Sequence, residues 1–149
     1  MNLFLKFKTR NRQEVLDFEL GNLVFPREDN VMAPIISRAG VWEKEEVDWL
    51  KANVTEGSVC LNIGSNVGYF AIQMARLTGP NGFVYAVEPN PEVIPFLKLN
   101  IENSGFKNVK VFKKAAGDKD GLKKLYLNRR NYGDSRMFDP RKTSGGVTI

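Results

Sequence analysis

Residues 59–70 (VCLNIGSNVGYF) constrain the fold of this 149-residue chain more than any other stretch. A short apolar run, 59–63, is followed by Gly64 and Gly68, and apolar residues then recur at helical spacing from Phe70 onward. A buried strand that breaks at a glycine turn and opens into a helix is typical of nucleotide-type pockets. An ordinary strand–turn–helix connection has the same pattern, so the rest of the sequence must decide between them.

The sequence beyond this turn alternates strands and helices. Apolar runs predict strands at 83–87 and 109–112, and helices are expected over about 67–78 and 91–103. Asn90 is expected to cap the second of these helices, with proline in its first position. Strand, helix, strand, helix, strand predicts parallel pairing through right-handed crossovers, and therefore an α/β open sheet.

The flanking segments are less regular. Partial alternation with period two over 3–7 and 15–25 predicts an N-terminal hairpin or edge strands. Prolines and a glycine among polar residues predict a loop over 26–40, and a helix is expected over 42–54 with acidic side chains in its first turn. After the third strand of the alternating series, 122–127 is expected to be a further strand.

Size and composition limit the classes of protein. A chain with 42% hydrophobic and 26% charged residues is globular, and we divide it into an N-terminal extension, 1–40, and one domain, 41–149. The single cysteine, Cys60, excludes a disulfide framework, and the lack of histidine removes the commonest general base and metal ligand. With no apolar run near the ~18 residues of a membrane span and no secretory signal, we expect no membrane span, no metal and a cytoplasmic location.

Charge is unevenly distributed along the chain. Residues 1–105 carry ten basic and thirteen acidic side chains, whereas residues 106–149 carry twelve and four. Such a basic segment can bind phosphorylated or nucleic-acid partners, but no recognised nucleic-acid motif accompanies it. We favour a solvated basic face, so a nucleic-acid partner is not expected.

The spacing of the glycines restricts the ligand. The dinucleotide fingerprint has glycines at its first, third and sixth positions, which here are Gly64, Asn66 and Tyr69. Two of the three positions are not glycine, so a dinucleotide is disfavoured. No G-K-[S/T] follows, so a nucleoside triphosphate is disfavoured as well. S-adenosylmethionine fits better, because it carries ribose and adenine without a phosphate. Glu88 ends the second strand of the series, where a carboxylate can accept hydrogen bonds from both ribose hydroxyls; the alternative is a solvated acid before a turn.

Three segments resemble the FkbM family of S-adenosylmethionine-dependent methyltransferases: NIGSNVGYF (62–70), VYAVEPNP (84–91) and AAGDKDG (115–121). WEKEE (42–46) is also similar to the segment before that family's first core strand. The resemblance covers about residues 40–138. It implies a Rossmann-like class I methyltransferase fold, a parallel open sheet with helices on both faces. It also implies methyl transfer to a hydroxyl oxygen of a sugar or small-molecule metabolite.

The resemblance assigns a set of cofactor-binding residues: Asn62, Gly64, Ser65, Asn66 and Gly68 in the turn, Glu88 and Pro89 after the second strand, and Ala116 and Asp118 within the adenine segment 115–118. The family usually has an acid where Asn62 stands, so weaker binding of the cofactor's ammonium group is expected. No side chain is assigned as the catalytic base. Asp118 and Asp134 lie in the appropriate half of the sequence, but both are interpreted as turn residues.

The family's fold continues with a fourth strand and three more, and this sequence ends before them. We therefore expect the cofactor-binding half of the fold without the acceptor-binding half. A bare edge on the central strand predicts self-association through that edge. Two alternatives remain: a catalytically inactive cofactor-binding or interaction module, and an RNA-modifying protein that uses the basic segment.

Overall fold

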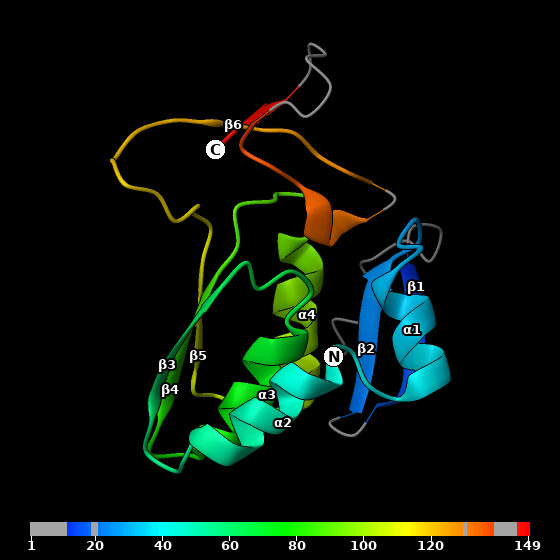
Figure 1. Cartoon of the computed structure of the whole chain (residues 1–149), viewed down its shortest axis with the longest axis vertical. Helices are drawn as coiled ribbons and strands as arrows, with labels where there is room; N and C mark the ends of the chain where they lie inside the picture. Colours follow the sequence, from blue (N-terminus) through cyan, green and yellow to red (C-terminus); the bar gives the residue numbers. More distant parts are fainter. Residues whose placement is uncertain (1–11, 19–20, 130, 139–145) are drawn as a thin grey trace, which may run out of the picture.

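The computed structural model describes residues 12–18, 21–129, 131–138 and 146–149. Figure 1 shows its elements, which in chain order are β1 (Arg12–Phe18), β2 (Gly21–Pro26), α1 (Met32–Ala39), α2 (Lys44–Asn53), β3 (Val59–Ile63), α3 (Tyr69–Thr78), β4 (Phe83–Val87), α4 (Ile94–Ser104), β5 (Val109–Phe112), β6 (Lys124–Leu125), a 3₁₀ turn (Tyr132–Asp134) and β7 (Val147–Thr148). The strand predicted at 3–7 lies outside the described residues.

The strands β3, β4 and β5 form a parallel sheet in that order, joined by the crossover helices α3 and α4. All three strands begin and end at the predicted residues. Each is a short apolar run bounded by turn residues, so its limits can be read locally. The predicted α/β class with a parallel open sheet is confirmed.

Helices cover one face of this sheet. Val84 and Ala86 of β4 pack against Ala71 and Ala75 of α3, and Cys60 of β3 is partly buried beside them. Because α3 and α4 connect neighbouring strands with the same direction of crossover, both lie on the same side, as Figure 1 shows. Burial raises the pKa of the Cys60 thiol, as is usual for a small core residue.

The opposite face of the sheet is exposed. Val59, Leu61 and Ile63 have exposed fractions of 70%, 59% and 57%, and Tyr85 of β4 is exposed beside them. These residues alternate with the helix-facing ones, as the two-residue period of a strand requires. Two expectations are corrected. Within the described residues helices cover one face rather than both, because both crossovers have the same direction, and β3 is exposed on one side rather than buried.

The helices differ from their predicted limits where proline intervenes. The helix expected from Pro91 begins at Ile94, because the side chain of Asn90 accepts a hydrogen bond from Glu92 N at 2.9 Å and closes a turn first. Pro95 then lies in the first turn of α4, where its missing N–H removes no intrahelical bond. α2 and α3 lie inside the ranges predicted for them.

Residues 26–40 are not a loop throughout, because α1 occupies 32–39. Asp29 accepts a hydrogen bond from Ala33 N at 3.0 Å, which satisfies one of the free donors in the first turn. Pro34 also lies in that turn, where a helix tolerates proline. Gly40 ends α1 with φ 71°, donating its N–H to Ile36 O at 2.8 Å.

The N-terminal elements share a core with the helices of the sheet. β1 and β2 pair antiparallel, so the run 15–25, expected to be part of a hairpin or an edge strand, contributes to both strands of a hairpin. Phe25 and Ile36 belong to one buried cluster with Tyr69 and Ile72 of α3. The buried side chain of Asn100 bonds both sides of this contact: Nδ2 donates to Val24 O (2.9 Å) and Val67 O (2.8 Å), and Oδ1 accepts from Val24 N (2.8 Å). The division of the chain at residue 40 stays a prediction.

Beyond β5 the chain is irregular. The strand predicted at 122–127 is reduced to β6, which pairs antiparallel with β7, a partner more than 20 residues away in sequence. Tyr126 and Arg136 form a further antiparallel bridge. We refer to residues 126–129 and 131–136 as the C-terminal loop. None of the helices in the described part of the chain has the length and hydropathy of a membrane span.

Candidate functional site

The glycine turn after β3 lies at the same end of the sheet as Glu88. Gly64 N and Ser65 N donate to Val87 O, the last residue of β4, at 2.9 and 3.0 Å. The turn needs glycine at two positions: Gly64 has φ 75° and Gly68 has φ 97°. At Gly68 a Cβ atom would also lie 2.9 Å from Leu97 Cδ1, so this glycine permits close approach of the turn to α4.

Glu88 is buried, with an exposed fraction of 6%, and the protein backbone binds both of its carboxylate oxygens. Oε2 accepts a hydrogen bond from Asn66 N and Oε1 accepts one from Asn90 N, each at 2.8 Å. Burial raises the pKa of Glu88, and the bonds from Asn90 and Asn66 act in the opposite direction. A carboxylate oxygen accepts more than one hydrogen bond, so each oxygen can still accept one from a ligand.

Two carbonyl oxygens in the turn have no hydrogen-bond partner. Asn62 Oδ1 and Asn66 Oδ1 are buried, and neither accepts a hydrogen bond within the described residues. The neighbouring Ser65 is satisfied, since its hydroxyl donates to Asn62 O at 2.9 Å. An unpaired buried acceptor costs about 1–3 kcal/mol, so two together indicate a ligand that brings N–H or O–H donors to the turn.

The remaining predicted contacts lie in two places. Pro89 is half-buried between Glu88 and Asn90. Ala116 and Asp118 are exposed and line a different cavity, of about 540 Å³, together with Met137 and Ile149. That cavity includes none of the turn residues. The structure therefore brings together Asn62, Gly64, Ser65, Asn66, Gly68, Glu88 and Pro89, and it places Ala116 and Asp118 elsewhere.

General base and metal ligand are two further roles that acidic side chains of the chain could have. The carboxylate of Asp134 accepts hydrogen bonds from Arg136 and Asn128, which hold the pKa of that carboxyl below the ordinary value. This contact pattern suits the predicted turn residue better than a general base. In the part of the chain that the structure describes, no group of three or more His, Cys, Asp or Glu side chains could hold a metal ion.

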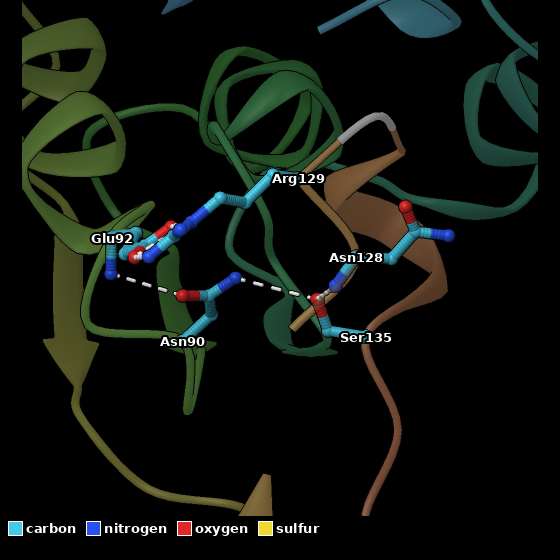
Figure 2. A network of polar contacts seen from close by, with 5 residues as sticks. All are labelled: Asn90, Glu92, Asn128, Arg129 and Ser135. Carbon is cyan, nitrogen blue, oxygen red and sulfur yellow. Dashed lines mark hydrogen bonds and ion pairs between the residues drawn. The ribbon is translucent and has the colours of Figure 1, made fainter. Parts of the chain in front are cut away.

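Sequence reasoning missed the C-terminal loop, which lies against the site. Asn90 Nδ2 donates to Ser135 Oγ at 3.4 Å, and Asn128 N donates to the same oxygen at 3.3 Å; Figure 2 shows both bonds as dashed lines. Arg129 and Glu92 form an ion pair with Nη2–Oε1 and Nε–Oε2 distances of 2.6 and 3.0 Å. These residues are 37 to 45 positions apart in sequence, so no local pattern could have indicated the contact.

Known proteins match the middle of the chain. Residues 54–126 match the family model described as "Methyltransferase domain". Protein-L-isoaspartate O-methyltransferase of Methanococcoides burtonii is 48% identical over 58 residues, which cover 39% of this chain and 29% of that protein. The probable cobalt-precorrin-6B C(15)-methyltransferase (decarboxylating) of Sulfolobus acidocaldarius is 32% identical over 71 residues, 46% of this chain and 37% of that protein.

A solved structure of a SAM-dependent methyltransferase from Aquifex aeolicus aligns with a TM-score of 0.46 and 26% identity, over 59% of this chain and 46% of that chain. The chain spans less than a third of the length of the first three curated relatives, at 29%, 27% and 32%. The matched family and relatives are methyltransferases of several kinds. Membership of the FkbM family in particular stays a prediction.

Proposed function

We propose that this chain carries the cofactor-binding part of an S-adenosylmethionine-dependent methyltransferase. The match of residues 54–126 to a methyltransferase domain supports this, because the matched segment contains both the glycine turn and Glu88. The observation that carries the proposal is the hydrogen bond of 2.8 Å between Asn66 N and Glu88 Oε2. It joins the turn to the acid at the carboxyl end of the parallel sheet, where open α/β folds bind ligands.

In this proposal each group of the cofactor meets a matching group of the chain. The free lone pairs of Glu88 accept the ribose hydroxyls. The unpaired oxygens of Asn62 and Asn66 accept the ammonium protons of the methionine part, and the backbone of Gly64, Ser65 and Gly68 lies against that part. Pro89 is a neighbour of the adenosine part, whereas Ala116 and Asp118 line a separate cavity, so their assignment to the adenine side stays a prediction from the resemblance. When bound, the cofactor supplies a methyl group on a positively charged sulfur.

Calorimetric titration of S-adenosylmethionine into the 149-residue chain tests the proposal. We expect saturable heat with one site per chain. NAD is the matched control ligand, since it carries adenosine and a pyrophosphate, which the glycine spacing does not suit. Saturable binding of NAD with no heat from S-adenosylmethionine would overturn the assignment.

The acceptor is proposed to be a hydroxyl oxygen of a sugar or small metabolite, and a cytoplasmic location stays a prediction. The chain's contribution to transfer would be alignment of the cofactor in a site sheltered from water. Because no base is assigned, a catalytically inactive cofactor-binding module is the second candidate. Methyl transfer from labelled cofactor to hydroxylated small molecules separates the two, since only an active enzyme gives a labelled product.

Substituting Asn62 with aspartate is expected to strengthen S-adenosylmethionine binding by about tenfold, since a charge-assisted hydrogen bond to the ammonium is roughly twice as strong as a neutral one. The buried position of Asn62, 9% exposed, increases the effect of a charge there. Calorimetry at pH 7.5 measures it. The control Asn62→Leu removes the acceptor and should weaken binding; an unchanged affinity in both variants would show that the ammonium lies elsewhere.

Self-association is proposed to occur through β3 and the exposed face beside it. Among the strands that the structure describes, β3 is an edge strand, and its free edge together with Val59, Leu61 and Ile63 offers backbone groups and apolar area to a second molecule. Leu61→Glu should weaken association by about tenfold or more, because it places charges at the contact. Light scattering at micromolar protein measures this, with Leu122→Glu, 79% exposed outside the sheet, as the control. A wild-type chain that is monomeric throughout contradicts the proposal.

A further inference from the structure

Both polar atoms of the Asn90 side chain form hydrogen bonds, and the backbone N–H of Asn90 forms one with Glu88. Its backbone N–H donates to Glu88 Oε1 at 2.8 Å, its Oδ1 accepts from Glu92 N at 2.9 Å, and its Nδ2 donates to Ser135 Oγ at 3.4 Å. The residue is 1% exposed. The position of one Glu88 oxygen therefore depends on a residue that the C-terminal loop contacts.

The other Glu88 oxygen depends on a residue that the same loop approaches. Oε2 accepts its hydrogen bond from Asn66 N. Gly133 of the C-terminal loop lies beside Asn66, because a Cβ atom built on Gly133 would be 3.5 Å from Asn66 Nδ2. Both N–H donors that fix the carboxylate thus belong to residues in contact with one loop.

The C-terminal loop is fastened by packing and by charge. Tyr132 is 7% exposed and belongs to the main buried cluster with Val67 and Val93, the residues that flank the turn and α4. Arg129 forms an ion pair with Glu92 (Figure 2), but the pair is exposed to solvent and contributes little by itself. The packing of Tyr132 anchors the loop, and Ser135 bonds Asn90, the residue whose N–H donates to Glu88.

Ser135 has the geometry of a fixed acceptor. Its oxygen accepts hydrogen bonds from Asn90 Nδ2 and from Asn128 N, one from each side of the contact. A hydroxyl that accepts twice joins the two donors' segments through a single atom. Removing that oxygen would free the Asn90 side chain from the loop while leaving its other hydrogen bonds in place.

We propose that the C-terminal loop positions the Glu88 carboxylate for its ligand and that Ser135, acting through Asn90, is the positioning residue. The proposal rests on the assignment of Glu88 as the ribose-binding acid. Ser135→Ala should weaken S-adenosylmethionine binding by about fivefold, the scale of one partly buried hydrogen bond. Ser135→Thr keeps the hydroxyl and should bind within about twofold of wild type.

The experiment compares these variants by calorimetry, with Ser104→Ala as the matched control. Ser104 also loses a hydroxyl bond, 2.7 Å to Ile101 O, at the far end of α4, and should bind the cofactor as wild type does. In a Glu88→Gln background the effect of Ser135→Ala should shrink to less than about twofold, because residues that act through one another are not additive. Ser135→Cys replaces the hydroxyl with a group of similar volume, so it repeats the test without the void that Ser135→Ala leaves.

A second measurement does not require the cofactor. Carbon-detected NMR titration of the Glu88 carboxyl should show a higher pKa in Ser135→Ala than in wild type, because a looser Asn90 N–H stabilises the ionised form less. The charged pair of Glu92 in the adjoining turn and Arg129 in the C-terminal loop is unchanged in each variant. An unaltered Glu88 pKa, or equal losses of affinity in Ser135→Ala and Ser104→Ala, overturns the positioning role. A wild-type chain that gives no heat with the cofactor refutes the proposed function instead, and the NMR result then still decides the role of Ser135.

Discussion

Replacing Glu88 with alanine is expected to weaken S-adenosylmethionine binding by about 100-fold or more. Each hydrogen bond to a charged group contributes about 1.5–3 kcal/mol, and the proposed site loses two bonds to the ribose. The substitution also leaves Asn66 N and Asn90 N without their acceptor, and the bond from Asn66 N is the one that joins the turn after β3 to the turn after β4. Calorimetry at pH 7.5 measures the change in affinity, and circular dichroism verifies that the variant is folded.

Two control variants accompany this measurement. Glu102→Ala removes an exposed acid at the far end of α4 and should bind normally. Glu88→Gln keeps one acceptor oxygen, so its loss should be smaller, about tenfold. Equal affinity of Glu88→Ala and wild type would remove Glu88 from the site.

Because the pKa of Glu88 is raised, both the stability of the fold and the affinity of the wild-type site for the cofactor should depend on pH. Burial favours the protonated form in the folded chain, so the group stabilises the fold most below its unfolded pKa, and that contribution is lost as the pH rises through the folded pKa. Binding has the opposite sign, because the ribose hydroxyls need the ionised acceptor. In the wild type, affinity for the cofactor should fall as the pH drops through the folded pKa of Glu88, whereas Glu88→Gln should show no such fall.

Gly82→Ala is expected to destabilise the fold by about 3 kcal/mol, at the upper end of the range for overpacking. A Cβ atom at Gly82 would lie 2.5 Å from Thr78 Cβ and 2.6 Å from both Ser58 O and Thr78 O. Two of these three atoms are backbone oxygens with hydrogen bonds of their own: Ser58 O, just before β3, accepts from Phe83 N at 3.0 Å, and Thr78 O, at the end of α3, accepts from Gly57 N at 2.8 Å. They cannot move without disturbing the entry to β3 and β4.

Urea denaturation followed by far-UV circular dichroism measures this loss in the free energy of unfolding. Gly117→Ala is the matched control. Its nearest non-neighbouring atom is Lys119 O at 3.8 Å, so its stability should stay within about 0.5 kcal/mol of wild type. If Gly82→Ala and Gly117→Ala unfold at the same urea concentration, the close approach at Gly82 is absent in solution.

The strands of the sheet could be predicted to the residue, because β3, β4 and β5 are apolar runs with turn residues at both ends. The exposure of one face of β3 could not be predicted. Parallel strands are usually covered on both faces, and which face is covered here depends on the direction of two crossovers, not on the strand's own residues. α1 was missed because Pro34 was interpreted as a loop residue, although the first turn of a helix tolerates it.

Part of the candidate site could also be predicted from the sequence, and part could not. The meeting of the turn at Gly64 with Glu88 could be predicted, because parallel strands that follow one another end at the same edge. The contact between Asn90 and Ser135 spans 45 residues and depends on how Tyr132 packs, so it needed the three-dimensional arrangement. The position of Ala116 and Asp118 in a separate cavity could not be predicted either, because no regular element fixes the course of the chain between β5 and β6.

The buried amide of Asn100 bears on how this protein can be shortened for experiments. One side chain bonds the backbone of the hairpin at Val24 and the backbone of the ligand-binding turn at Val67. A version beginning near residue 41 would remove the two bonds of that amide to Val24, leaving only the bond to Val67, and would expose the side chains around Tyr69. The hairpin is therefore better kept when fragments are designed, because it buttresses the turn that the ligand would touch.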